Sequence, residues 1–107
     1  MMRDKRRYIL VESAEGIAGA EQDAFAEALY GELLKAVGEI NYPSVNPKIM
    51  KFVDGKRFII RSSLSGQDTL VLALSLIKSL NGNETAFYTL KSSGTIKTLD
   101  DLTENTV

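Results

Sequence analysis

The chain has 107 residues, a formal net charge of −1, no cysteine and no histidine, and 44% of its residues are hydrophobic. This length suits one hydrophobic core and is too short for two, so a single domain over residues 1–107 is expected. The missing residue types exclude disulfides, thiolate or imidazole catalysis and the commonest zinc sites. No apolar stretch suits a signal peptide or a membrane span, so a soluble, cytoplasmic protein without membrane partners is expected.

Charge is unevenly distributed along the chain. A basic leader, residues 1–7, holds four cations and one acid, and residues 40–97 hold eight cations and three acids. Residues 20–39 hold five acids and one lysine, and a short acidic tail, residues 98–107, holds three acids. A surface with two signs fits a protein that contacts RNA on one side and a protein on another, although solvated charges alone would give the same pattern.

The first predicted strand and helix follow the leader. Residues 8–12 are apolar on both faces, as in a central strand. Residues 20–37 are predicted to form a helix with an apolar stripe at steps of four. Gly31 costs this helix about 1 kcal/mol relative to alanine, which suggests a close backbone approach. Tyr30 and Leu34 lie beside the stripe, where they either contact a partner or widen the core side.

Two short strands, residues 49–53 and 56–61, surround Asp54-Gly55, the strongest hairpin signal in the chain. Strict alternation predicts which face of the sheet each side chain takes. Met50, Phe52, Phe58 and Ile60 are expected to face the helices, and Lys51, Arg57 and Arg61 the opposite side.

A second helix is predicted from a Ser65 cap, with Asp68 at the third position, to Leu80. Leu72 and Leu76 make it apolar nearly all round, so this helix is either deeply buried or also contacts another protein. The last strand is predicted over residues 85–91.

The order strand, helix, strand, strand, helix, strand predicts an α+β fold of the split βαβ, ferredoxin-like or RRM-like type. Such a fold is a four-stranded antiparallel sheet with two helices on one face. The other face would carry Lys51, Arg57, Arg61 and Lys91, with Phe87 available for stacking on RNA bases. The third strand lacks the paired aromatics of the RRM signature, so the chain is not identified as an RRM. The tail after Lys97, or a partner, is the alternative cover for this face.

Residues 92–97, Ser-Ser-Gly-Thr-Ile-Lys, combine hydroxyls, a glycine and a cation. Loops of this composition suit phosphate oxygens. In the alternative interpretation, Gly94 makes a tight turn, and Thr98 with Asp101 caps a final helical turn. No paired carboxylates, nucleotide-binding glycine loop or nucleophile-base pair occurs, so no catalytic residue and no metal site are expected in this chain.

Three segments together resemble ribonuclease P protein component 2, the Pop-five/Rpp-fourteen type family of archaea and eukaryotes. They are Arg3-Asp4-Lys5-Arg6-Arg7-Tyr8-Ile9, Leu29-Tyr30-Gly31-Glu32 and Ser93-Gly94-Thr95-Ile96-Lys97. The resemblance implies a subunit of the endoribonuclease that removes the 5′ leader from precursor tRNA. The RNA would carry the catalytic site and its Mg²⁺, and the protein would hold no cofactor. The implied partners are ribonuclease P RNA, precursor tRNA and the TIM-barrel-like component 3, in a homodimer or a heterotetramer.

The expected contact residues fall into two sets. The RNA-binding set is Arg3, Lys5, Arg6, Arg7, Arg57, Arg61, Lys91, Ser93, Gly94, Thr95 and Lys97, and the partner-binding set is Tyr30, Leu34, Leu72 and Leu76. Two alternatives on the same fold stay open at this point. One is an ACT-like small-molecule regulatory module, for which Gly16 and Gly19 would form a weak ligand loop, and the other is a protein-protein adaptor.

Overall fold

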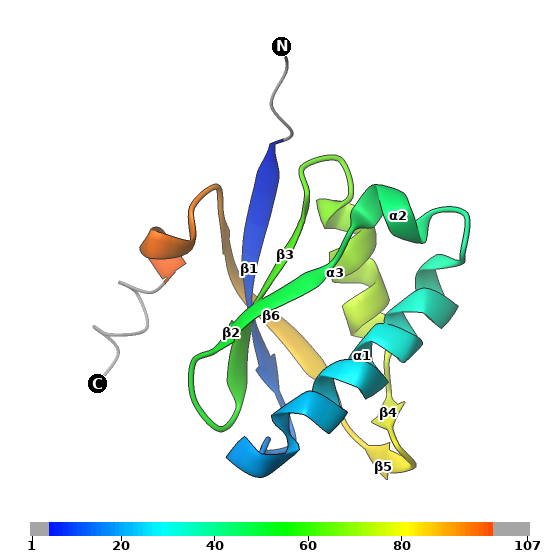
Figure 1. Cartoon of the computed structure of the whole chain (residues 1–107), viewed down its shortest axis with the longest axis vertical. Helices are drawn as coiled ribbons and strands as arrows, with labels where there is room; N and C mark the ends of the chain where they lie inside the picture. Colours follow the sequence, from blue (N-terminus) through cyan, green and yellow to red (C-terminus); the bar gives the residue numbers. More distant parts are fainter. Residues whose placement is uncertain (1–4, 100–107) are drawn as a thin grey trace.

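A four-stranded antiparallel sheet forms the centre of the computed structural model, which describes residues 5–99. The strand order is β2-β3-β1-β6, so the first strand is central, as predicted. The bounds are β1 Arg6–Ser13, β2 Lys48–Phe52, β3 Arg57–Ser63 and β6 Phe87–Ser93. Helices α1 (Gln22–Val37) and α3 (Gln67–Leu76) lie together on one side of this sheet (Figure 1). The predicted α+β, split βαβ architecture is therefore confirmed.

Shorter elements correct three predicted boundaries. The first helix starts at Gln22, because η1 (Gly19–Glu21) is a separate 3-10 turn. The second starts after Gly66 without a side-chain cap, so Ser65 is not its cap, and it ends at Leu76 rather than Leu80. Its end has a local cause, since Ile77 is extended and the next residues form a small hairpin. The remaining elements are α2 (Tyr42–Val45), β4 (Ser79–Leu80) and β5 (Asn83–Glu84).

The main core lies between the sheet and the two long helices. Its fully buried side chains come from β1, β3, α1 and α3 and include Ile9, Val11, Leu29, Leu33, Phe58, Ile60, Leu70 and Leu74. Phe25 packs edge-on against Phe58 and Phe87, with ring centroids 5.5 and 6.0 Å apart. Each such side chain stabilises the fold by about 1.5–3 kcal/mol, so this layer holds α1 and α3 against the strands.

A smaller core covers the opposite face of the sheet. Residues 96–99 form a helical turn after β6, and Leu99 is completely buried there with Leu10 and Ile59. Ile96 and Met50 pack around the same cluster. In Figure 1 this turn lies away from α1 and α3. Residues from the start of the tail therefore cover the middle of the face that was expected to be open, as the alternative interpretation proposed.

Two β-bulges correct the predicted alternation. A register shift between Ile49 and Lys51 sends Met50 to the second face, whereas it was expected to face the helices. Another shift, between Leu10 and Val11, changes the parity along β6. Phe87 is consequently in the helix-side core, only 6% exposed, so it is not available for stacking on RNA. One extra residue in a strand moves every side chain beyond it to the opposite face of the sheet. A prediction that assumes strict alternation therefore fails after a bulge.

Two further findings concern the helices. A Cβ atom at Gly31 would meet nothing within 4 Å, so the close approach expected there does not occur. Between residues 5 and 99, none of the helices has the length and apolar character needed to cross a membrane.

Candidate nucleic-acid interface

A groove of about 670 Å³ lies where β1 begins, beside α2 and the loop from β3 to α3. Three cations line it, namely Lys5, Arg6 and Arg61. The remaining lining is mostly small and polar, and no lining residue is acidic. These other residues are Pro43, Ser44, Asn46, Ser62, Ser63, Leu64 and Ser65. We call this feature the basic groove; the start of β1, α2 and the loop from β3 to α3, which line it, lie at the top of Figure 1.

Strand pairing brings the cations together from distant parts of the chain. Arg6 is opposite Ser63, and Tyr8 is opposite Arg61, so Arg6 and Arg61 are diagonal neighbours on one face of the sheet. The Leu64 backbone N–H donates to the Lys5 carbonyl over 3.0 Å, which extends the pairing into the loop. The three positive charges thus converge on one end of the two central strands.

Gly66 allows the wall of the basic groove to close. A Cβ atom there would lie 2.7 Å from Val45 Cα and 2.7 Å from Ser63 Oγ, closer than real Cβ atoms approach. In this space Ser63 Oγ donates to the Ser44 carbonyl over 2.6 Å and accepts from the Gly66 N–H over 3.0 Å. Only glycine permits this approach, which allows the Ser63 hydroxyl to connect the loop before α3 to α2.

Arg7 lies on the other face of the sheet, where it joins three elements. Its Nε donates to Gln67 Oε1 over 2.7 Å, and its Nη2 donates to Ser92 Oγ over 3.3 Å. Its Nη1 lies 3.5 Å from where a Cβ of Gly94 would stand. Among residues 5–99, no carboxylate forms an ion pair with this guanidinium.

The loop at residues 92–97 is organised mainly by its own hydrogen bonds. Ser92 and Ser93 end β6, and the Thr95 N–H donates to Ser93 Oγ over 3.2 Å. The Thr95 and Thr98 hydroxyls are 2.8 Å apart. Gly94 does not adopt positive φ. The alternative interpretation is correct only in part: a helical turn does follow at residues 96–99, but Thr98 lies inside this turn and does not cap it, and Thr95 is the residue that precedes it. Asp101 lies outside the described residues.

Arg57 is paired within its own hairpin. Its Nε and Nη2 donate to Asp54 Oδ2 over 2.9 and 2.7 Å. The pKa of the Asp54 carboxyl is lowered, mainly by its hydrogen bonds from the Arg57 side chain and to a smaller extent by that from the Lys56 backbone N–H. A phosphate that bound Arg57 through Nε and Nη2 would have to displace this carboxylate, because both of these nitrogens already donate to it.

The remaining cations of the expected RNA-binding set do not gather at one point, and neither does Lys51, which was expected only on the open face. Lys91 is opposite Leu10 and Lys51 is opposite Ile59, so both belong to the second face, with Arg57 and Arg61. Lys97 is exposed on the covering turn. Arg3 lies outside the described residues. The structure therefore unites Lys5, Arg6 and Arg61 and separates them from Arg7, which occupies the helix side of the sheet.

The basic groove also contains residues that sequence analysis missed. They are Ser44, Asn46 and the hydroxyls of residues 62–65. A signal was present, since Ser62-Ser63-Leu64-Ser65-Gly66 has the same hydroxyl and glycine composition after a strand as residues 92–97. No group of three or more acidic side chains within residues 5–99 could hold a metal ion.

The expected partner-binding residues occupy the outer side of α1 and α3. Leu72 and Leu76 are 60% and 59% exposed, and Leu34 is 38% exposed. Tyr30 differs from them, because its hydroxyl accepts a hydrogen bond from the Ile49 backbone N–H over 2.8 Å. The three leucines are thus apolar side chains exposed among the described residues, whereas the Tyr30 phenol connects α1 to β2.

Known proteins resemble this chain along nearly its whole length. Ribonuclease P protein component 2 of Pyrococcus furiosus is 31% identical over 102 residues, which cover 92% of this chain and 82% of the relative. The proteins of the same name from Thermococcus kodakarensis and Pyrococcus horikoshii are 31% and 33% identical over 99 residues, with the same coverage of both chains.

A solved structure shares the fold. A chain in a cryo-EM structure of yeast ribonuclease MRP superimposes with a TM-score of 0.61 at 18% identity, covering 89% of this chain and 78% of that chain. Neither an ACT-like module nor a simple adaptor is supported by these comparisons. The model of the Rpp14/Pop5 family matches residues 7–102, and on this evidence the chain belongs to the Rpp14/Pop5 family of ribonuclease P protein subunits.

Proposed function

We propose that this protein organises the catalytic RNA of ribonuclease P for removal of the 5′ leader from precursor tRNA, and that the basic groove holds RNA phosphates. The supporting observation is the convergence of Lys5, Arg6 and Arg61 on a groove with no acidic lining. Serine hydroxyls and cations are the groups that position a nucleic-acid backbone without reading its sequence. The reaction itself, with its Mg²⁺, is assigned to the RNA, and the expected location is the cytoplasm.

Arg7 and the turn after β6 extend this proposed contact. Arg7 starts from the same end of β1 as Arg6, but on the opposite face of the sheet. Arg7 with Lys97 would contact a second stretch of backbone. An RNA strand that contacts both the basic groove and Arg7 would pass over the edge of the sheet. It would not lie flat on the second face, because residues 96–99 already cover the centre of that face.

Binding measured against salt concentration tests the groove. The triple variant Lys5→Ala/Arg6→Ala/Arg61→Ala should bind ribonuclease P RNA more weakly. Its slope of log K against log salt should be smaller by about 2–3, as expected for three lost phosphate contacts. A matched control, Lys35→Ala/Lys56→Ala/Lys78→Ala, removes the same charge from exposed positions outside the groove. If both triple variants lose the same affinity and slope, general charge rather than the groove binds the RNA, and the proposal is wrong.

Cleavage assays address the rest of the RNA-binding set. With component 3 and the catalytic RNA present, Arg6→Ala/Arg7→Ala and Lys97→Ala should each slow the processing of precursor tRNA at limiting protein. Unchanged rates for both variants would remove these residues from the interface.

The outer apolar side of α1 and α3 is our proposed surface for component 3. Leu72→Ala/Leu76→Ala should weaken that association while leaving the fold intact, because both side chains are more than half exposed. Ile40→Ala, which truncates a 91% exposed side chain in a loop, is the control and should have no effect. Equal association of both variants would place the partner elsewhere.

A further inference from the structure

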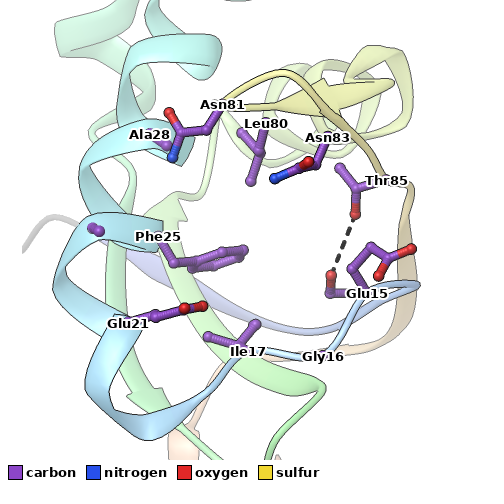
Figure 2. A pocket seen from close by; sticks show the side chains of 12 residues that line it. Glu15, Gly16, Ile17, Glu21, Phe25, Ala28, Leu80, Asn81, Asn83 and Thr85 are labelled. Carbon is purple, nitrogen blue, oxygen red and sulfur yellow. Dashed lines mark hydrogen bonds between the residues drawn. The ribbon is translucent and has the colours of Figure 1, made fainter.

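A second cavity, of about 350 Å³, lies at the other end of β1. It is enclosed by the loop after β1, the start of α1 and the β4–β5 hairpin, as Figure 2 shows. The residues that decide its chemistry are Glu15, Ile17, Glu21, Phe25, Leu80 and Asn83. We call it the acid-rimmed pocket. None of the RNA-binding or partner-binding residues expected from the sequence lines it.

Its inner surface is apolar and its edge is acidic. Ile17 and Leu80 are 6% and 8% exposed, and the Phe25 ring points into the cavity (Figure 2). The carboxylates of Glu15 and Glu21 are exposed at the edge, and no lysine or arginine belongs to the lining. A ligand that suits both parts needs an apolar stem and a positive end.

Backbone hydrogen bonds hold the walls in place. The Ser13 N–H donates to the Lys56 carbonyl over 2.7 Å, and the Ile17 N–H donates to the Gly55 carbonyl, so the β2–β3 hairpin supports the first wall. The Thr85 N–H donates to the Lys78 carbonyl over 3.0 Å across the base of the small hairpin. The pocket is therefore formed before any ligand arrives, which reduces the entropy that binding must overcome.

Size and charge together narrow the class of ligand. The volume is at the lower end of the range for ligand sites, enough for one side chain rather than for a large cofactor. Phosphates would be repelled by the two carboxylates, so RNA is not the occupant. Arginine combines a planar cation that stacks on aromatic rings with donors that match carboxylates, and it is among the residues that anchor protein-protein interfaces.

From these observations we infer that the acid-rimmed pocket receives an arginine side chain of a protein partner. The guanidinium would be held by Glu15 and Glu21, with its stem over Phe25 and Ile17. This contact is independent of RNA binding at the basic groove, because the two sites share no residue.

A pair of isosteric probes tests the inference on the full chain. N-acetyl-arginine amide and N-acetyl-citrulline amide have almost the same shape, but only the first is charged. Both are titrated into the ¹⁵N-labelled protein, and the signals of Ile17, Phe25, Asn81 and Asn83 are followed. The arginine probe should give saturable shifts with a Kd on the order of 1–10 mM, as for a single side chain, and the citrulline probe should bind at least about fivefold more weakly.

Two pairs of variants locate the site. Glu15→Gln/Glu21→Gln should weaken binding of the arginine probe at least about fivefold, whereas Glu27→Gln/Glu39→Gln removes the same charge outside the lining and should not. Ala24→Leu fills the edge of the pocket and should abolish the shifts. Ala36→Leu, an exposed substitution on the same helix, is its control.

Each outcome decides the inference. Selective, saturable arginine shifts that disappear in the pocket variants support it. Equal binding of both probes, no shifts at all, or equal loss in the control variants overturns it. Agmatine is titrated as a free organic cation; if it binds much more tightly than the arginine probe, the ligand is a small molecule and the assignment to a partner side chain is wrong. None of these results depends on RNA binding.

Discussion

The two ends of β1 have opposite chemical character. At its start the basic groove gathers Lys5, Arg6 and Arg61 among serines, with no acid. At its end the acid-rimmed pocket has Glu15 and Glu21 above an apolar floor, with no cation. The strand that separates them has eight residues and is therefore roughly 23 Å long.

The difference shows why the net charge of −1 is uninformative about partners. At this separation and physiological salt, charges at the two ends are largely screened from each other, since the Debye length is only about 8 Å. The local charge at each end, rather than the net charge, therefore determines which ligands that end attracts. If both proposals hold, a polyanion is attracted to one end and a cationic side chain to the other, and one small domain connects RNA to protein.

The largest expected effect concerns the smaller core on the second face of the sheet, between the two ends of β1. Leu99→Ala should lower the free energy of unfolding by about 2–4 kcal/mol, because it leaves a cavity against Leu10 and Ile59. Leu90→Ala, at a 47% exposed position, should change it by less than about 1 kcal/mol. Urea denaturation measures both. A negligible effect of Leu99→Ala would mean that the covering turn is not firmly docked.

Gly66→Ala acts on the basic end alone. The added methyl group would meet the Val45 backbone, so a loss of about 1–3 kcal/mol is expected, together with weaker RNA binding. Probe titration at the acid-rimmed pocket should be unchanged, which would confirm that the ends are independent. Gly19→Ala is the control, because a Cβ there meets nothing within 4 Å. Comparable losses in both variants would contradict the packing argument.

Gly31→Ala should affect neither end. Its Cβ would stand in open space on an exposed part of α1, so the substitution should raise the free energy of unfolding by about 0.5–1 kcal/mol. Thermal denaturation measures the gain.

Gly38→Ala should instead lower the free energy of unfolding, because Gly38 has a φ of 91° that alanine adopts only with strain. A stabilised Gly38→Ala variant would show that this backbone strain is absent in solution.

The smallest effect is a pH dependence near the acidic end. The Asp54 pKa is lowered in the folded state, mainly by the Arg57 side chain, so ionised Asp54 favours folding. Its contribution is complete above the unfolded-state pKa, about 3.9, and disappears as the pH falls through the lower folded-state value. Urea midpoints of the wild type and Asp54→Asn should therefore converge in acid. A difference that is independent of pH would exclude the ion pair as its source.

Local patterns predicted the four strands of the sheet and the two long helices in the correct order, but not η1, α2, β4 and β5. The apolar run of β1, the alternation of β3, the steps of four in α1 and the Asp54-Gly55 turn depend on neighbours in sequence, so they can be read from the sequence directly. The faces of Met50 and Phe87 were predicted wrongly, because bulges arise from the fit between paired strands and not from either strand alone. The end of α3 was missed for a similar reason, since β4 forms only with β5 as its partner.

By itself, the sequence determined the fold class, the central place of β1 and the resemblance to ribonuclease P component 2. These depend on periodicity, turn chemistry and short segments. Which cations lie close together was decided by the tertiary structure alone. Pairing of β1 with β3 places Arg6 beside Arg61, whereas Arg7, the next residue in the chain, points to the other face. The acid-rimmed pocket is likewise built from segments more than fifty residues apart, and only the packed chain brings them to one surface.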